Sequence, residues 1–267
     1  MEFTTERVLE RKLKAVEDAI YEDVLELPVW QTRQGYYAAP GEYTDCGEWE
    51  SISLGERWVC SDGTTRWFKT TVEIPEKFAG KYVVLELDFG GEALVKINGV
   101  IKSALTSYLE KNEAQRTRVV LPGIPSAGER LEIEAEAGLN YMEFAAFRRQ
   151  GITSIEYQFR MAKMAVVDPV AEKYYFDIKT AFDAVMALKS PIDKLAAANV
   201  RIPFETTRVL ESFTKDSYMY KKILDAVLHS LTVADADMGR DLLIKSIPSA
   251  ASILKEKLSK IPHNPHA

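Results

Sequence analysis

The chain has 267 residues, of which 46% are hydrophobic and 28% are charged, and its formal net charge is −6. These values are ordinary for a globular protein, and they exclude the basic surface of a protein that binds nucleic acid or an anionic membrane. No apolar run is long enough to cross a bilayer, and the N-terminus lacks the apolar stretch of a secretory signal. We therefore expect a cytoplasmic protein that has neither nucleic acid nor a membrane as a partner.

Residues 1–28 are predicted to form an N-terminal helix. Apolar residues recur there at spacings of three and four, which places them on one side of a helix. These residues are Leu9, Leu13, Val16, Ile20 and Val24. Pro28 ends the pattern.

From residue 29 to residue 168 the apolar period changes to two, which predicts an antiparallel β-sandwich. The residues expected to face its core are Phe68, Thr70, Val72, Ile74, Val83, Leu85, Leu87, Phe89, Ala93, Val95, Ile97, Leu131, Ile133 and Ala135. Gly90-Gly91 is expected to form a tight hairpin, and Asn98-Gly99 a second turn, so that this segment is a meander within one sheet. Glu86 and Asp88 alternate with the apolar set and are expected to face water.

Residues 169–267 return to a helical period, so the predicted fold class is α+β: an N-terminal helix, a sandwich and a helical region. Helices are expected at about 173–190, 204–215, 218–233 and 249–260. The third has a broad apolar face, made of Ile223, Leu224, Val227, Leu228 and Leu231. A face this wide needs partners on more than one side, which predicts a docking surface and self-association.

Residues of the types that act in catalysis or bind metals are few in this sequence, and they do not form recognisable motifs. The sequence has neither a phosphate-binding P-loop nor a G-x-S-x-G elbow. His229 is expected to be a packed or surface residue, and His263 with His266 supplies too few ligands for a metal. Two carboxylate sets, Glu132, Glu134 and Glu136 on one strand and Asp235 with Asp237 in a helix connection, have no aromatic flanks and are interpreted as solvated. We therefore assign no catalytic residue, no metal ligand and no cofactor to this chain.

The two cysteines, Cys46 and Cys60, are expected to be free structural thiols. They are close enough in sequence to pair, but a chain without a secretory signal favours reduced thiols. Further Cys or His residues at metal-ligand spacing are missing around them.

Aromatic residues are concentrated in the first quarter of the chain. All four tryptophans lie there: Trp30, Trp49, Trp58 and Trp67. Aromatic rings can stack on the apolar faces of sugars, so Trp49, Trp58 and Tyr43 are candidate sugar-binding residues. The alternative, which we favour, is that the aromatic residues fill the sandwich core.

Several stretches of the sequence resemble a known family. "WFKTTVEIPEKFAGKYVVLELDFGGEALVKINGV" (67–100) resembles the core of the galactose-binding-like, jelly-roll sandwiches of large glycosidases. Three further stretches complete the resemblance: "LPVWQTRQGYY" (27–37), "WESISLGERW" (49–58) and "EKYYFDIKTAFDAVMAL" (172–188). In this order they resemble the N-terminal region of the α-mannosidases of glycoside hydrolase family 38.

The resemblance implies a parent enzyme that is a zinc-dependent, retaining exo-α-mannosidase. Members of that family continue into a catalytic domain with a G-H-x-H-I-D motif that supplies zinc ligands. This sequence contains no such motif. We therefore expect a region truncated before the catalytic domain, with zinc held by that domain.

Three hypotheses follow for the chain itself. In the first it is the non-catalytic part of an α-mannosidase, with the catalytic domain of the same polypeptide as its partner, and it forms a homo-oligomer. In the second it is an independent carbohydrate-binding module whose partner is a glycan. In the third it is an accessory domain of another glycosidase family, which the helical region after the sandwich disfavours.

Overall fold

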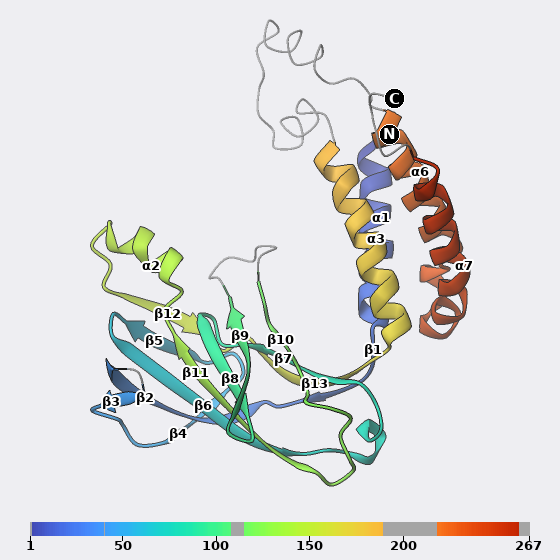
Figure 1. Cartoon of the computed structure of the whole chain (residues 1–267). Helices are drawn as coiled ribbons and strands as arrows, with labels where there is room; N and C mark the ends of the chain where they lie inside the picture. The colour runs from blue at the N-terminus through green and yellow to red at the C-terminus, as the bar shows by residue number, and fades with distance from the viewer. Residues whose placement is uncertain (1, 40, 108–114, 189–217, 262–267) are drawn as a thin grey trace, which may run out of the picture. The chain divides into compact units, whose positions relative to one another are not determined.

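The computed structural model describes residues 2–39, 41–107, 115–188 and 218–261. Contacts divide the chain into two units, which we call the sandwich unit and the helical unit (Figure 1). The sandwich unit is Tyr21–Val167. The helical unit combines Met1–Ile20 with Asp168–Ala267. The fold class is α+β, as predicted.

The sandwich unit is built from antiparallel sheets. Its strands, in chain order, are β1 (Tyr21–Glu26), β2 (Val29–Ala39), β3 (Glu42–Thr44), β4 (Glu50–Ser53), β5 (Arg57–Ser61), β6 (Thr64–Glu73), β7 (Val83–Asp88), β8 (Glu92–Ile97), β9 (Val100–Thr106), β10 (Arg118–Val120), β11 (Arg130–Gly138), β12 (Ser154–Gln158) and β13 (Met161–Val167). A four-stranded sheet has the order β1-β13-β7-β10. A seven-stranded sheet has the order β3-β2-β6-β11-β8-β9, with β4 also paired to β2, and β5 pairs with β12.

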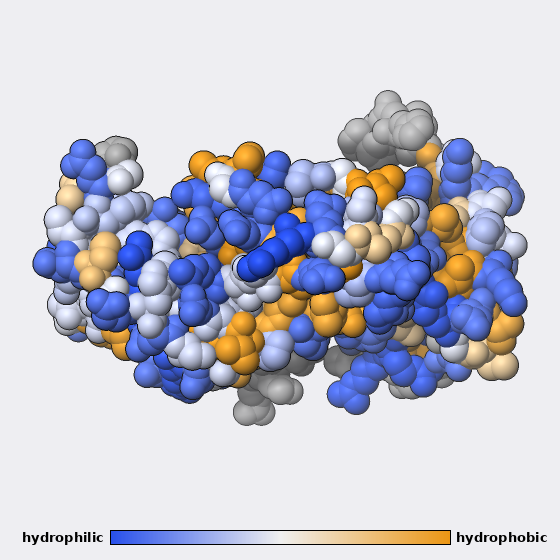
Figure 2. Space-filling model, turned by 90° about the horizontal axis from the view of Figure 1, so that it is seen from below, coloured by the Kyte–Doolittle hydropathy of each residue, from blue (hydrophilic) through white to orange (hydrophobic). Residues whose placement is uncertain are grey.

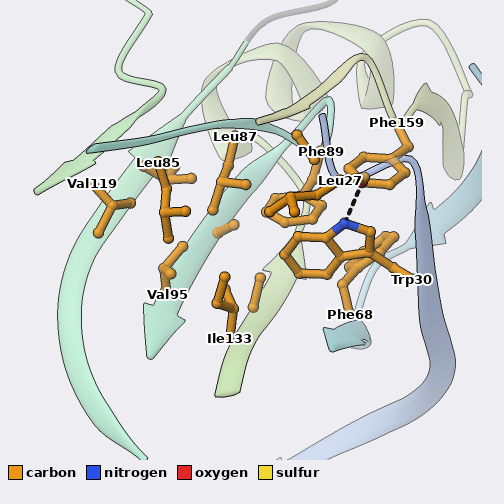
Figure 3. Close-up of a cluster of buried hydrophobic side chains, with 14 of the residues drawn as sticks. Leu27, Trp30, Phe68, Leu85, Leu87, Phe89, Val95, Val119, Ile133 and Phe159 are labelled. Carbon is orange, nitrogen blue, oxygen red and sulfur yellow. Dashed lines mark hydrogen bonds between the residues drawn. The ribbon is translucent and has the colours of Figure 1, made fainter. Parts of the chain in front are cut away.

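The sandwich core confirms the predicted period of two. On β11, residues alternate between exposed or half-buried and fully buried positions along the strand. Figure 3 shows side chains of the two sheets in this core, with Leu85 and Leu87 of β7 near Val95 and Ile133 of the larger sheet. Trp30 lies among aromatic rings at one end, where its indole N–H donates a hydrogen bond of 2.9 Å to the backbone oxygen of Leu27.

The predicted hairpin at Gly90-Gly91 was wrong, because β7 and β8 belong to different sheets. The two glycines connect the sheets, and of the two only Gly90 has a positive φ, 95°. A Cβ atom at Gly91 would lie 2.2 Å from the backbone oxygen of Gly138, so close backbone approach requires glycine there. The Asn98-Gly99 turn was predicted correctly: it joins β8 to β9, with φ of 50° and 75°.

Among its described residues, the sandwich unit also contains two short helical elements that the period of two did not predict. They are the helix α2 (Tyr141–Arg148) and a 3-10 turn (Glu76–Phe78). Phe144 of α2 and Phe78 of the turn are 2% and 0% exposed, so both elements contribute to the core.

In its described residues, the helical unit contains four long helices. They are α1 (Glu2–Ala19), α3 (Pro169–Leu188), α6 (Tyr218–Val233) and α7 (Arg240–Ser259), with a 3-10 turn (Ala236–Met238) before α7. The prediction of helix up to Pro28 was wrong, because the chain after Ala19 forms β1 and pairs with β13. Val24 keeps the helical spacing in the sequence, but it is 41% exposed.

Helix α7 begins nine residues before the predicted Ser249, because Pro248 lies inside the helix instead of before it. The helix predicted at 218–233 matches α6. The helix predicted at 204–215 lies outside the described residues. In the part of the chain that the structure describes, no helix has the length and apolar content needed to cross a bilayer.

The apolar face of α6 is used inside the helical unit. Ile223, Val227 and Leu231 are 8%, 0% and 0% exposed, and α6 packs against α3 and α7. Leu224 and Leu228 are half-buried against the same core. We expected this face to need a partner outside the chain, and that premise was wrong: neighbouring helices cover most of it. Docking to a catalytic domain stays a prediction.

Candidate functional site

Trp58 lies in the sandwich core and is not available to a sugar. It is 2% exposed, and its indole N–H donates a hydrogen bond of 2.7 Å to the backbone oxygen of Phe89. The rings of Phe68 and Tyr157 lie 5.6 and 5.2 Å from its ring. The expectation that Trp58 is an exposed candidate was therefore wrong, and the core alternative holds for this residue.

Trp49 and Tyr43 lie on the outer face of the seven-stranded sheet, which is the side away from the core. Lys69 and Arg33 alternate with core residues on β6 and β2, so their side chains reach this side. The Lys69 ammonium lies 3.8 Å and the Arg33 guanidinium 4.7 Å from the centroid of the Trp49 ring. Trp67 of β6 joins the group, with the Tyr43 ring edge-on to it at 4.6 Å. Both Trp49 and Tyr43 are half-buried.

Gly35 of β2 lets the Trp67 ring lie close against the sheet. A Cβ atom at Gly35 would be 2.8 Å from Trp67 Cζ3 and 3.0 Å from Cys46 Sγ. Any side chain at Gly35 would therefore displace the Trp67 ring. From the sequence alone, the alternation along β6 predicts that Trp67 points away from the core. It does not predict that the ring packs on Gly35, because that contact depends on how β2 and β6 pair in the folded sheet.

A hollow of 570 Å³ lies on the same outer face. It is lined by Val29, Trp30, Gln31, Ser51, Lys69, Thr70, Thr71, Glu132, Ile133 and Glu134. Lys69 connects the hollow to the Trp49 ring. Figure 2 shows one face of the molecule, on which hydrophilic residues predominate and hydrophobic residues lie in small groups among them.

The carboxylates of β11 differ in their surroundings. Glu132 and Glu134 are exposed, as predicted. Glu136 is half-buried and accepts a hydrogen bond from the Tyr43 hydroxyl, and its strand partner is Trp67. The expectation that aromatic residues do not flank this set was therefore wrong for Glu136. Burial raises the pKa of Tyr43, and the hydrogen bond to Glu136 raises it further.

Within the described ranges, no group of three or more His, Cys, Asp or Glu side chains is placed to hold a metal ion. His229 is exposed on α6, and His263 and His266 lie outside the described residues. Asp237 forms ion pairs with Arg11 and Lys12 at 3.1 and 3.2 Å. The described residues therefore do not fit a zinc ion of the kind that the resemblance assigns to the parent enzyme.

Glu86 of β7 is buried, although the alternation predicted that it faces water. It is 6% exposed and accepts hydrogen bonds from the Tyr21 hydroxyl at 2.7 Å and from Arg118 Nε at 2.6 Å. Thr117 also donates to it, at 3.2 Å. β7 is a central strand, and its outer side is covered by Arg118 from the adjacent β10 and by Tyr21 from β1, which lies beyond β13 in the sheet. Burial and the hydrogen bond to Glu86 raise the pKa of Tyr21.

Asp88, also predicted to face water, is 7% exposed and holds the connection between the two sheets. Its Oδ1 accepts hydrogen bonds from the Gly90 backbone N–H at 2.9 Å and from the Ser107 hydroxyl at 2.6 Å. Arg160 forms an ion pair with its Oδ2 at 2.9 Å. Both buried carboxylates, Glu86 and Asp88, therefore accept hydrogen bonds and pair with an arginine. Such fully satisfied buried charges are typical of a structural role.

Both cysteines are free thiols, as predicted, but only Cys60 is buried. Burial raises the pKa of the Cys60 thiol, which lowers its thiolate fraction. We expect dithionitrobenzoate at pH 8 to modify one thiol per native chain, at Cys46, and the second only after denaturation. Cys60→Ser should leave the native count at one, whereas Cys46→Ser should reduce it to zero. Fast modification of both thiols in the native chain would contradict this assignment.

Solved structures with detectable similarity include two bacterial β-glucuronidases. The enzyme of Ruminococcus gnavus, in complex with N1-substituted uronic isofagomine, is 10% identical, with a TM-score of 0.37 over 56% of this chain and 30% of that chain. The enzyme of Faecalibacterium prausnitzii is 15% identical, with a TM-score of 0.38 over 55% of this chain and 32% of that chain. The chain thus spans about a third of their length, and similarity at this level supports no conclusion about activity.

A family model identifies the sandwich more specifically. No curated protein matches the sequence. The model described as "Alpha-mannosidase, jelly roll domain" matches residues 23–182, which run from β1 through the whole sandwich unit into α3. This match covers more than half of the chain. The chain therefore belongs to the family of α-mannosidase jelly-roll domains.

Proposed function

We propose that this chain is the non-catalytic N-terminal part of a zinc-dependent, retaining α-mannosidase of glycoside hydrolase family 38. The observation that carries the proposal is the family match across residues 23–182. In this proposal the parent polypeptide supplies a catalytic domain that holds zinc and hydrolyses α-mannosides. The present chain is its scaffold and docking partner, in the cytoplasm and as part of a homo-oligomer.

The two cores support a role as scaffold. The sandwich unit has a continuous core drawn from both of its main sheets, and the helical unit has a second core drawn from four helices. The buried carboxylates Glu86 and Asp88 are engaged by arginines and hydroxyl groups, which suits structural roles. A pair of folded units with satisfied buried charges can position a neighbouring domain without taking part in its chemistry.

The match to an α-mannosidase domain also supports this proposal over an accessory domain of another glycosidase family. An independent carbohydrate-binding module is the second candidate, and the group of Tyr43, Trp49 and Trp67 on the outer face supports it. The second candidate adds sugar binding by the purified chain, which the scaffold role neither requires nor excludes.

We expect the purified chain to leave 4-nitrophenyl α-mannoside unhydrolysed, with or without added zinc. The described residues hold no cluster suited to a metal, and the β11 carboxylates project from one strand instead of flanking a sugar from two sides. The measurement is release of nitrophenolate, with a known α-mannosidase as positive control. Zinc-dependent turnover that persists through repeated purification, and that follows the chain on a sizing column, would contradict the proposal.

A further inference from the structure

The hollow on the outer face of the seven-stranded sheet has the composition of a ligand site. We propose that it binds a neutral oligosaccharide, through Gln31, Lys69 and Glu134 in the hollow and Trp49 beside it. Its volume of 570 Å³ lies within the range of about 300–1,000 Å³ that is usual for small-ligand sites. This inference does not rest on the proposed scaffold function, because it concerns the isolated chain.

The charges around the hollow select against an ionic ligand. Glu132 and Glu134 line it together with Lys69. Lys96 is the strand partner of Glu134 on β8, and Arg33 lies next to the Trp49 ring. Positive and negative groups are therefore interleaved, and neither sign dominates. Such a surface offers no net field to attract a phosphate, a polyanion or a polycation, and it suits an uncharged polar ligand.

The side chains of the hollow offer both kinds of hydrogen bond. The Lys69 ammonium donates, the carboxylates of Glu132 and Glu134 accept, and the Gln31 amide does both. Ser51 and Thr71 add hydroxyl groups. A ligand matched to this set must itself donate and accept at several closely spaced points. The hydroxyl groups of a sugar do so, because each has one donor and two acceptor positions.

Trp49 supplies the apolar part of the site. Its ring is half-buried, and the cations of Lys69 and Arg33 lie against it at 3.8 and 4.7 Å. These contacts hold the indole beside the hollow without removing it from solvent. The exposed part of the ring can pack on the C–H face of a sugar whose hydroxyl groups reach Lys69 and Glu134. An aromatic surface with a few placed polar groups is the usual composition of a small-ligand site.

The test is calorimetric titration of the 267-residue chain with neutral tetrasaccharides of mannose and of glucose. A tetrasaccharide of galacturonic acid is the anionic comparison. We expect at least one neutral tetrasaccharide to bind with a Kd of about 1 mM or tighter. The anionic one should bind at least about tenfold more weakly. Binding should also change the tryptophan fluorescence, because Trp49 contacts the ligand.

Two variants locate the site. Trp49→Ala and Gln31→Ala each remove a partly or fully exposed side chain, so both should fold. We expect Trp49→Ala to weaken binding about tenfold or more, and Gln31→Ala to weaken it several-fold. The matched control is Tyr141→Ala, which removes an aromatic side chain that is 63% exposed on α2, away from the hollow. This control should leave the Kd unchanged.

Three results would overturn the proposal. The first is the absence of heat and fluorescence change for every neutral tetrasaccharide up to about 10 mM. The second is neutral binding that neither Trp49→Ala nor Gln31→Ala weakens. The third is preferential binding of the anionic tetrasaccharide. If the free chain binds no sugar and a catalytic domain of the parent covers the hollow, the proposal is also overturned. The hollow is then a docking surface for that domain.

Discussion

Replacing Phe68 with alanine is expected to lower the free energy of unfolding of the sandwich unit by about 3–5 kcal/mol. Phe68 is 0% exposed and lies at the centre of the aromatic core. Its ring is 5.6, 4.7 and 5.7 Å from the rings of Trp58, Phe89 and Phe159. These partners come from different elements of the sandwich, so the cavity left by the substitution cannot be filled by a local adjustment.

Urea denaturation followed by tryptophan fluorescence measures this loss in the sandwich unit alone. All four tryptophans of the chain, at positions 30, 49, 58 and 67, lie in that unit. The matched control is Ile101→Ala on β9, because Ile101 is 58% exposed and its truncation should change the free energy by less than about 0.5 kcal/mol. Equal effects of the two substitutions would show that Phe68 is not a core residue.

Replacing Arg118 with methionine is expected to destabilise the sandwich unit by about 3–5 kcal/mol. The substitution removes the cation that pairs with Glu86 at 2.6 Å and leaves a carboxylate that is 6% exposed without its main partner. The double variant Arg118→Met with Glu86→Gln should be more stable than Arg118→Met alone, because the buried charge is then also removed.

The matched control for this prediction is Arg57→Met. Arg57 pairs with Glu156, but the two side chains are 66% and 51% exposed, so the loss should be below about 1 kcal/mol. The measurement is again urea denaturation followed by tryptophan fluorescence. A loss at Arg118 no larger than that at Arg57 would contradict the description of Glu86 as a buried, paired charge.

The sandwich was predictable because its strands carry an alternation that depends only on local sequence. Val95 and Ile97 of β8, and Ile133 of β11, were all expected inside and are at most 1% exposed. The sheet to which each strand belongs was not predictable in this way. The Gly90-Gly91 connection has the residues of a hairpin, but the chain crosses between sheets there.

The buried carboxylates show where alternation fails. It separates the two sides of a strand, but it does not tell which side reaches solvent. Glu86 and Asp88 lie on the outer side of a central strand, where Tyr21, Arg118 and Arg160 cover them. These partners are distant in the sequence, and their approach depends on strand register. The same limit applies to the N-terminal segment, where Val24 continues a helical spacing although pairing with β13 makes it a strand.

The candidate site was predictable in part. Trp49 and Tyr43 were selected because aromatic rings can stack on sugars, and they lie on the outer face of the larger sheet. Trp58 was selected by the same criterion and is buried, because it alternates inward on β5. Lys69 and Gln31 were not selected, since single polar residues on the outer side of a strand are common. They become informative only when the sheet brings them to one hollow.

The chain is proposed to be the non-catalytic part of an α-mannosidase, and binding to the catalytic domain tests this proposal. The most direct measurement mixes the purified chain with the separately produced catalytic domain of its parent, and it follows α-mannoside hydrolysis and co-elution on a sizing column. We expect a stoichiometric complex whose zinc-dependent activity or stability exceeds that of the catalytic domain alone, while the chain by itself remains inactive. A catalytic domain that neither binds the chain nor changes in its presence would contradict the claim.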